Sequence, residues 1–375
     1  MSKKYKVMTI LGTRPEIIRL SEVIKKCDKE FDHILVHTGQ NYAYELNEIF
    51  FKQLGLKSPD YYLDAVGKDL GETMGNVIAK SYDLIKEVKP DAVLILGDTN
   101  SALSAISAKR LKTPIFHMEA GNRCWDWNVA EMTNRTIVDH ISDINMPYSH
   151  VAYDNLVKEG LPKNWIIRTG SPMKEVILAH KDEIEKSDIL NRLGLKKDRY
   201  IVVSAHREEN VDIESKFNRL YPSLNRIADE YGMPVVFSVH PRTKKRFEDK
   251  GFKLSKNIID SKPFGLFEYE KLQENAYVVL SDSGTLTEES SLLDFPAVLV
   301  RTSTERQEGC IHGSIVIGGV DYDTIKPSID LARKLHRNGN NKVVPDYDTT
   351  DVSEIVVNTI KEYIDVINKE TWLKE

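Results

Sequence analysis

The chain of 375 residues has few of the features that mark secreted, membrane or nucleic-acid-binding proteins. Its three cysteines, Cys27, Cys124 and Cys310, are too few and too far apart for a disulfide framework. No stretch reaches the roughly 18 apolar residues of a membrane-spanning helix, and the apolar run at 7–11 is too short for a signal peptide. The 52 basic and 57 acidic residues give a net charge of −5, which argues against binding nucleic acid mainly through phosphate contacts. We therefore expect a cytoplasmic protein with no nucleic-acid or membrane partner, and a local basic site stays open.

Several cofactor motifs are also missing from the sequence. It contains no G-x-G-x-x-G, no G-x-x-x-x-G-K-[ST], no H-E-x-x-H and no Cys/His cluster with the spacing of metal ligands. Ser283 lacks the G-x-S-x-G elbow of a serine hydrolase. We therefore expect no metal and no nicotinamide cofactor.

Short apolar runs alternate with longer amphipathic segments, a pattern typical of parallel sheets covered by helices. The predicted strands are residues 6–11, 33–37, 92–96, 115–117, 200–204, 235–239, 277–281 and 297–300. Apolar periodicity predicts a helix over 72–89, stopped by Pro90, and a last helix over 352–367 that should pack against another part of the chain.

The alternation pauses at residues 169–172, where we place a hinge. The predicted fold class is α/β, with two Rossmann-type doubly wound parallel-sheet domains facing a cleft. The predicted domains are residues 1–171 and 172–350, followed by a terminal helix in 351–375. In such folds ligands bind at the carboxyl ends of the strands, so the sites should lie where strands stop.

Three carboxylates follow strands of the first half. Asp98 and Glu119 end successive predicted strands, and Glu131 lies in the polar loop after them, with Arg135 close behind. Paired carboxylates at strand ends suit proton transfer, but Asp98 could instead cap a helix and Glu131 could be a solvated loop residue. Before them, the turn at 12–16 could present Arg14 and backbone amides to an anion, or could be a simple turn.

The second half carries candidates for holding an anion. His206 and Arg207 follow one strand and would offer positive or switchable charge to a phosphate or leaving group. Ser283 and Gly284 form a turn that opens a helix, where backbone donors could face a diphosphate. Two more candidates lie further on: a carboxylate of the same helix, Glu288 or Glu289, could bind ribose hydroxyls, and Arg306 adds a guanidinium. We expect His240 to be structural.

Seven motifs occur in order along nearly the whole chain: GTRPE, GDTN, MEAGNR, AHREEN, VHPRT, SDSGT and TER. Together they resemble the UDP-N-acetylglucosamine 2-epimerase family. The segments GTRPEIIRLS, HTGQNY, HMEAGNRC, IVDHISDIN and AHREEN look closest to the branch that makes UDP-N-acetyl-L-fucosamine from UDP-2-acetamido-2,6-dideoxy-L-talose.

The resemblance implies a GT-B-like architecture in which the C-terminal domain holds UDP and the last helix crosses back to the N-terminal domain. It implies a homodimer serving surface-polysaccharide synthesis. It also implies a mechanism in which UDP leaves from C1, an enzyme-bound 2-acetamidoglycal forms, and a proton returns to the other face of C2, without nicotinamide or metal.

Matched to the family's motifs, the expected catalytic residues are Asp98, Glu119, Glu131 and His206. The expected UDP-sugar-binding residues are Arg14, Arg19, Arg135, Arg207, Ser283, Gly284, Glu289 and Arg306. Arg19 stands where the better-known branch of the family has lysine.

The loop at 124–135 departs from the family pattern. Within this loop, Ala130 stands where we expect proline and Met132 where we expect an acid; in the second half of the chain, Gln307 stands where we expect proline after Arg306. With Trp127, this loop should be more apolar and should favour a sugar deoxygenated at C6 or carrying extra acyl groups. The same departures leave open a hydrolysing epimerase, a glycosyltransferase or a catalytically silent UDP-sugar sensor.

Overall fold

The computed structural model describes residues 4–39 and 44–374 of the chain. They divide into two compact units, one of Met1–Ala179 with Thr349–Glu375 and the other of His180–Asp348. The first unit runs past residue 171 because helix α7 (Met173–Ala179) packs against α1 (Arg14–Glu30). Residues 40–42, the last three of the HTGQNY motif, lie outside the described residues.

The sheet of the first unit has six parallel strands in the order β3-β2-β1-β4-β5-β6. Their bounds are β1 (Lys6–Leu11), β2 (Asp32–His37), β3 (Tyr61–Tyr62), β4 (Ala92–Leu96), β5 (Ile115–Met118) and β6 (Ile144–Met146). The strand order reverses between β1 and β4, which is the switch point where open α/β sheets bind ligands.

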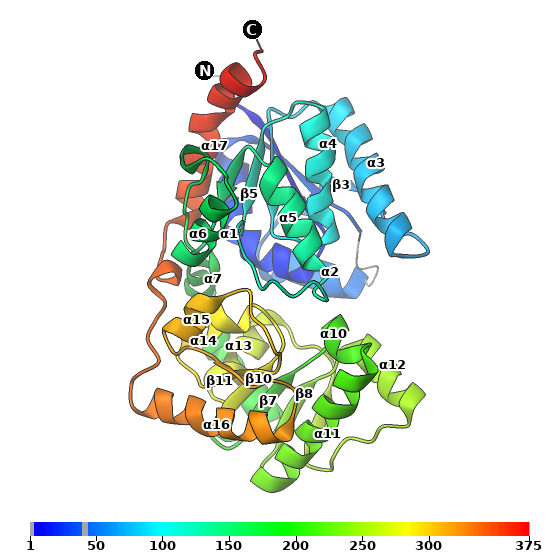
Figure 1. The fold of residues 1–375 in the computed structure, drawn as a ribbon, viewed down its shortest axis with the longest axis vertical. Helices are drawn as coiled ribbons and strands as arrows, with labels where there is room; N and C mark the ends of the chain where they lie inside the picture. The colour runs from blue at the N-terminus through cyan, green and yellow to red at the C-terminus, as the bar shows by residue number, and fades with distance from the viewer. Residues whose placement is uncertain (1–3, 40–43, 375) are drawn as a thin grey trace. The chain divides into compact units, whose positions relative to one another are not determined.

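Helices cover both faces of this sheet (Figure 1). Besides α1 and α7 they are α2 (Tyr44–Gln53), α3 (Leu70–Val88), α4 (Ser104–Arg110), α5 (Glu131–Ile141), α6 (His150–Lys158) and α17 (Val352–Val366). Shorter turns are η1 (Asn100–Leu103), η2 (Lys163–Trp165) and the π-helical η4 (Ile367–Thr371). The core between the sheet and α3 and α4 buries Met8 and Ile10, which alternate along β1 and so share one face.

Helix α3 shows how the sequence sets these boundaries. Asp69 caps its start, because the Asp69 side chain accepts a hydrogen bond from the Glu72 amide at 2.8 Å. It ends at Lys89, which adopts the left-handed conformation with φ 51°, just before Pro90. The helix predicted over 72–89 is confirmed.

The second unit repeats the same sheet topology, in the order β12-β11-β10-β7-β8-β9. Its strands are β7 (Ile201–Ser204), β8 (Val235–Ser238), β9 (Ile258–Ser261), β10 (Val278–Ser281), β11 (Ala297–Leu299) and β12 (Val316–Ile317). All are parallel, and the order reverses between β7 and β10.

Helices again cover both faces, as the alternation of buried residues shows. Ile201 and Val203 face the core under α11 (Glu214–Tyr231) and α16 (Tyr322–Arg337), whereas Val202 faces the core under α13 (Leu266–Glu274) and α14 (Leu286–Leu293). The remaining elements are α8 (Lys181–Lys186), α9 (Ile189–Arg192), α10 (Glu208–Val211), α12 (Pro241–Lys250), α15 (Gln307–Ile311) and η3 (Pro345–Tyr347).

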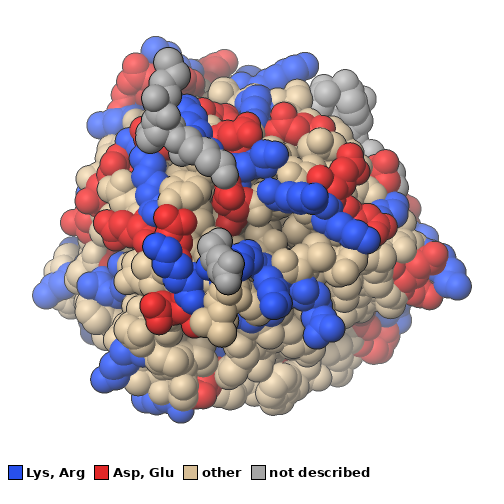
Figure 2. Space-filling model, turned by 90° about the horizontal axis from the view of Figure 1, so that it is seen from above, with Lys and Arg blue, Asp and Glu red and all other residues tan. Residues whose placement is uncertain are grey.

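Two doubly wound parallel sheets confirm the predicted α/β class. Among residues 4–39 and 44–374, no helix combines the length and the apolar character that a bilayer crossing requires. On the face shown in Figure 2, basic and acidic side chains are interspersed, in keeping with the near balance of charge in the sequence.

Candidate functional site

The turn after β1 is closed by a buried glutamate. Glu16, 1% exposed, accepts hydrogen bonds from the Gly12 amide (3.1 Å), the Thr13 hydroxyl (2.7 Å) and the Ser101 hydroxyl (2.5 Å). Burial raises the pKa of Glu16 to about 7, although these hydrogen bonds oppose the shift. Glu16 therefore ties the turn after β1 to the turn after β4. The guanidinium of Arg14 lies over the Phe50 ring at 5.5 Å.

Glu119 follows β5 in a backbone conformation that is unusual for a residue with a side chain, with φ 60°. Arg19 of α1 holds its carboxylate, with Nη1 2.5 Å from Oε2, and the two side chains are only 8% and 9% exposed. Asn122 donates to the other carboxylate oxygen at 3.3 Å. A Cβ added at Gly97 would lie 3.7 Å from Glu119 Oε2, so the Glu119 carboxylate lies beside the turn that carries Asp98.

Asp98, in the turn after β4, pairs with an arginine of α5. Arg135 Nη2 lies 2.5 Å from Asp98 Oδ2, and the Asn134 amide donates to the Asp98 carbonyl at 3.0 Å. The alternative that Asp98 caps the following helix is wrong, because Thr99 occupies that position in η1. Glu131 is the first residue of α5, the same helix that holds Asp98. The first unit thus gathers Asp98, Glu119, Arg19 and Arg135 at the carboxyl ends of β4 and β5.

The loop before α5 exposes two aromatic side chains. Trp125 is 61% and Trp127 64% exposed. Met132, where the family pattern has an acid, is fully buried in α5 and lies near Arg135, with Sδ 3.8 Å from Nη1. The exposed apolar surface of this loop therefore comes from the tryptophans, and the change at 132 adds none.

In the second unit a buried aspartate joins the turns after β7 and β10. Asp282 Oδ2 accepts from the Arg207 amide at 2.8 Å and from the Asn210 side chain at 3.0 Å. Next to Arg207, the His206 ring lies 5.7 Å from the His240 ring at an interplanar angle of 25°. Asp282 thereby fixes the backbone of Arg207, the residue after His206, at the switch point of this sheet.

Arginines surround the Gly284 turn. A Cβ added at Gly284 would lie 3.0 Å from Glu305 Oε1 and 3.8 Å from both Arg207 Nη2 and Arg306 Nε. Arg207 Nη2 lies 3.2 Å from Glu305 Oε1, and Arg306 Nη1 lies 2.7 Å from Glu288 Oε2 in a fully buried pair. Two guanidinium groups, each paired with a glutamate, therefore meet a glycine at the start of α14, where guanidinium groups and backbone amides are the donors that an anion would use.

Ser283 and Glu289 lie on either side of this turn. The Ser283 hydroxyl is 2.9 Å from the Thr285 hydroxyl. The Glu289 carboxylate is buried and accepts from Gln273 Nε2 at 2.8 Å. Behind it Glu270 is 1% exposed, and both of its carboxylate oxygens are buried without a hydrogen-bond partner among the described residues. Burial, together with the charges of Glu289 and Glu274, raises the pKa of Glu270 well above its ordinary value.

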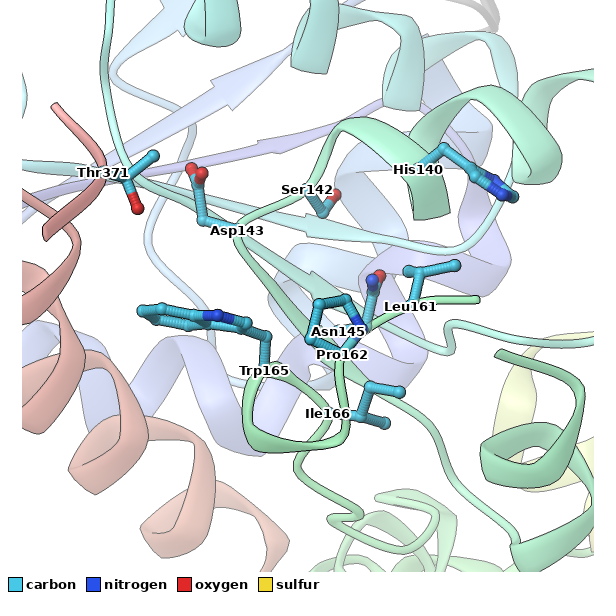
Figure 3. A pocket seen from close by; sticks show the side chains of 9 residues that line it. All are labelled: His140, Ser142, Asp143, Asn145, Leu161, Pro162, Trp165, Ile166 and Thr371. Carbon is cyan, nitrogen blue, oxygen red and sulfur yellow. The ribbon is translucent and has the colours of Figure 1, made fainter. Parts of the chain in front are cut away.

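A separate pocket of about 170 Å³ lies at the opposite, amino-terminal end of β6 (Figure 3). Its lining includes Trp165 and Asp143. The Asp143 carboxylate accepts a hydrogen bond from the Ile115 amide at 2.9 Å and pairs with Lys109 at 2.6 Å. None of the predicted site residues lines it. Within residues 4–39 and 44–374, no group of three or more His, Cys, Asp or Glu side chains is placed to hold a metal ion.

A family model described as UDP-N-acetylglucosamine 2-epimerase matches residues 25–361. The chain belongs to the UDP-N-acetylglucosamine 2-epimerase family. The structure of UDP-N-acetylglucosamine 2-epimerase from Rickettsia bellii is similar, with 46% identity and a TM-score of 0.92 over 99% of this chain and 100% of the other. That of the Methanocaldococcus jannaschii UDP-GlcNAc 2-epimerase in complex with UDP-GlcNAc and UDP has 32% identity and a TM-score of 0.88, covering 95% and 99%.

A curated relative with a different name is also similar. The UDP-2,3-diacetamido-2,3-dideoxy-D-glucuronate 2-epimerase of Pseudomonas aeruginosa is 36% identical over 86% of this chain and 91% of its own length. These matches confirm the epimerase family predicted from the motifs, and the full-length structural matches confirm the GT-B-like class.

Sequence reasoning missed several residues that hold the candidate site together. Glu16 carried a signal, because Thr13 and Glu16 have the spacing of a capping box. Asp282 and Glu305 lie inside motifs that were recognised, but nothing in the sequence indicates which arginine each one holds. Glu270 carried no signal, since a glutamate on an amphipathic helix reads as solvated.

Proposed function

We propose that this member of the epimerase family is a non-hydrolysing enzyme that inverts C2 of a UDP-2-acetamido-2-deoxy sugar. The observation that carries the proposal is the pair of carboxylates at neighbouring strand ends, each held by a buried arginine: Glu119 by Arg19 and Asp98 by Arg135. Inverting a carbon that carries a hydrogen requires one group to remove the proton and another to supply it from the opposite face. Carboxylates fixed in place suit both proton transfers.

In the proposed reaction a carboxylate takes the C2 proton, and the C2–H electron pair forms the C1–C2 double bond. The C1–O bond breaks at the same time, and UDP leaves with the electron pair of the C1–O bond. UDP then adds back to C1 of the glycal while a second group protonates C2 from the other face. Asp98, Glu119 and Glu131 are the proposed acid and base groups, and His206 stabilises the departing UDP.

The second unit is proposed to hold UDP. Arg207 and Arg306 next to Gly284 suit a diphosphate, because guanidinium groups bind phosphate through paired, charge-assisted hydrogen bonds. Ser283 adds a hydroxyl, and Glu289 is the proposed ribose contact. Arg14, Arg19 and Arg135 of the first unit are proposed to bind the substrate, and the family resemblance extends the proposal to a homodimer.

For the sugar, we propose a substrate less polar than UDP-N-acetylglucosamine, or one that carries an extra acyl group. Two exposed tryptophans, Trp125 and Trp127, precede Glu131 and support this preference, because aromatic surfaces favour apolar groups. The name of the Pseudomonas relative describes a diacetamido sugar, which agrees with the extra acyl group and not with lower polarity, because that sugar is a charged glucuronate. The 2-acetamido-2,6-dideoxy-L-talose and N-acetyl-L-fucosamine pair is the proposed case, in surface-polysaccharide synthesis, and the N-acetylglucosamine and N-acetylmannosamine pair is the comparison substrate.

The test is a proton NMR time course in D2O with UDP-N-acetylglucosamine and UDP-N-acetyl-L-fucosamine in parallel. We expect the C2 proton signal to disappear while the UDP-sugar stays intact, faster for the 6-deoxy sugar. Growth of free UDP with a reducing sugar would replace the proposal by a hydrolysing epimerase. Faster exchange of UDP-N-acetylglucosamine would refute the substrate preference alone.

A further inference from the structure

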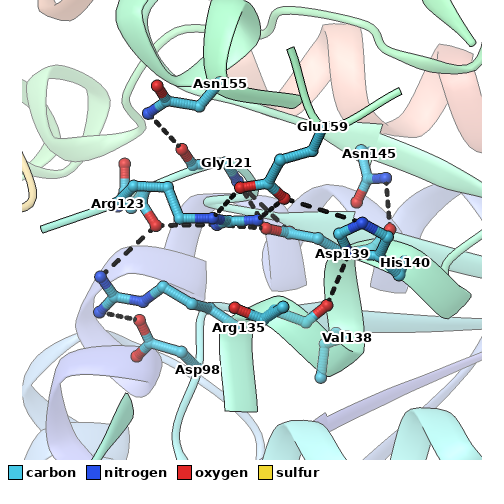
Figure 4. Close-up of polar contacts among 12 residues, drawn as sticks. Asp98, Gly121, Arg123, Arg135, Val138, Asp139, His140, Asn145, Asn155 and Glu159 are labelled. Carbon is cyan, nitrogen blue, oxygen red and sulfur yellow. Dashed lines mark hydrogen bonds and ion pairs between the residues drawn. The ribbon is translucent and has the colours of Figure 1, made fainter. Parts of the chain in front are cut away.

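Behind Glu119 lies a cluster of four charged side chains, His117, Arg123, Asp139 and Glu159, which we call the buried ion cluster. His117 Nδ1 lies 3.1 Å from Asp139 Oδ1, and Arg123 Nη1 lies 2.7 Å from Asp139 Oδ2, with all three side chains fully buried. Arg123 also grips Glu159 with two parallel hydrogen bonds of 2.6 and 2.7 Å (Figure 4). Two cations face two anions, so the cluster is balanced in charge when His117 is protonated.

The cluster contacts the backbone on both sides of the proposed catalytic carboxylates. His117 Nε2 lies 2.8 Å from the carbonyl of Gly97, the residue before Asp98. Asp139 accepts from the amide of Gly121, two residues after Glu119, at 3.2 and 3.3 Å. One hydrogen-bonded chain therefore links the turn of Asp98 to the turn of Glu119.

The Glu119 turn needs such support. Glu119 and Gly121 both have positive φ, 60° and 83°. A residue with a side chain in this region is strained and persists only where its surroundings fix it. A Cβ added at Gly121 would lie 2.3 Å from the Ala152 carbonyl oxygen, so the turn is also pressed against α6.

The surroundings of His117 define its protonation. Nε2 faces the Gly97 carbonyl, and Nδ1 faces Asp139 and, at 3.4 Å, Asn145 Oδ1. A neutral imidazole donates from one nitrogen, so both contacts are hydrogen bonds only in the imidazolium form. Burial disfavours the charged ring, but Asp139, the Gly97 carbonyl and Asn145 together raise the pKa of His117 above its ordinary value. Burial likewise opposes the charged form of Asp139, whose pKa is lowered by His117 and Arg123.

We propose that His117, protonated on both nitrogens, and Asp139 are positioning residues that fix Asp98 and Glu119 relative to each other. The proposal rests on the proposed function, because it treats these two carboxylates as acid and base groups. His117 does not touch substrate in this role. It acts through the Gly97 carbonyl, and Asp139 acts through the Gly121 amide.

The first experiment compares kcat and UDP affinity in His117→Gln and Asp139→Asn. We expect kcat to fall at least roughly tenfold in each, because a shift of about 1 Å in a reacting group can cost a hundredfold in rate. The affinity for UDP should stay within about twofold, since the UDP-binding residues lie in the other unit. Should His117→Gln fail to fold, Asp139→Asn carries the test. Unchanged kcat in Asp139→Asn would overturn the proposal.

His140→Gln is the matched control. His140 lies on α5 next to Asp139 and faces the same Glu159 at 3.8 Å, but its ring contacts neither the Gly97 nor the Gly121 backbone. Its kcat should equal that of the wild type. A fall as large as that of Asp139→Asn would overturn the proposal, because it would assign the effect to general loss of packing.

The second experiment is NMR of ligand-free protein labelled with ¹⁵N-histidine and ¹⁵N-glycine, with His117 assigned by the loss of its ring signals in His117→Gln. At pH 7 both ring nitrogens should carry protons, and the amide signals of Gly97 and Gly121 should move as His117 titrates. In the wild type, kcat should fall as the pH rises and His117 loses its proton. In Asp139→Asn, both this fall of kcat and the NMR titration of His117 should shift to lower pH, which a purely structural role would not produce. A single protonated nitrogen, or Gly97 and Gly121 signals that stay fixed, would overturn the proposal. If the wild type exchanges no C2 proton, the proposed function fails, and these NMR signals alone decide the positioning role.

Discussion

The two units use the same kind of ion pair with the roles of the partners reversed. In the first unit an arginine on a helix, Arg19 of α1, holds a carboxylate that follows a strand, Glu119 after β5. In the second unit a carboxylate on a helix, Glu288 of α14, holds an arginine in the loop after β11, Arg306. In both, a rigid helix supplies the partner that fixes a group at a strand end. Under the proposed function, the fixed group is negative where protons are transferred and positive where the diphosphate binds.

The largest effect on the reaction rate should come from removing the negative charge of a proposed catalytic carboxylate in the first unit. Glu119→Gln or Glu131→Gln should lower C2 exchange at least about a hundredfold, the usual worth of a general acid or base. UDP binding should stay within about tenfold, because the proposed UDP contacts are in the second unit. NMR in D2O and titration calorimetry measure the two quantities. Unaltered turnover in both variants would discard the site assignment.

Removing a positive charge in the second unit should instead weaken the binding of UDP. Arg207→Met removes a guanidinium beside Gly284, and UDP affinity should fall roughly 10- to 100-fold, since a hydrogen bond to a charged group is worth about 1.5–3 kcal/mol. Arg242→Met is the matched control, because Arg242 is exposed and pairs with Glu208 and Asp212. Calorimetry with UDP gives both values. Equal losses in the two variants would assign the effect to surface charge.

A smaller effect should separate charge from shape at Arg19. Arg19→Met removes the partner of Glu119, and kcat should fall about tenfold, the lower end of the value of a charged hydrogen bond. Arg19→Lys keeps the charge and should recover most of the rate. Steady-state kinetics of the two variants measure the difference. A lysine variant as slow as the methionine variant would show that the forked guanidinium matters more than its charge.

The smallest effect concerns stability in the second unit, where Glu270 is buried beside other carboxylates. Its folded-state pKa is raised, so the folded state holds this proton after the unfolded chain has released it. The stabilisation is full below about pH 4.3, the ordinary pKa, and is lost as pH rises. Glu270→Gln cannot ionise, so its free energy of unfolding should rise relative to that of the wild type as the pH increases from 5 to 8. Urea unfolding of both proteins at pH 5 and pH 8 measures these free energies. The same difference between the two proteins at both pH values would contradict the prediction.

The central strands could be predicted from the sequence, and the sheet edges could not. All eight predicted strands are present, whereas β3, β6, β9 and β12, the outermost strands of the two sheets, were missed. Central strands are covered on both faces and read as continuous apolar runs. Edge strands here are short, two to four residues, and β9 is only partly buried, so their sequences carry little apolar signal.

The candidate site likewise has a part that could be predicted from the sequence and a part that could not. The turns that carry Asp98, Glu119 and Gly284 could be predicted because they directly follow central strands. Their partners could not, because Arg19 and Glu119 lie 100 residues apart and Arg207 and Glu305 lie 98 apart. Pairing over such separations is set by the packing of helices on the sheet, and no local pattern encodes it. The chain also passes to the second unit after Ala179 and not after residue 171, since the Gly170-Ser171-Pro172 turn precedes a helix that packs against α1.

The last long helix has a consequence for how the protein is made. α17 packs against α1 and buries Val356, Val357, Ile360 and Ile364, so it forms one wall of the first unit. The ribosome synthesises it after the whole of His180–Asp348. The second unit can therefore complete its fold during translation while the first still exposes the apolar side of α1. The part of the protein that is made first is the part that is finished last.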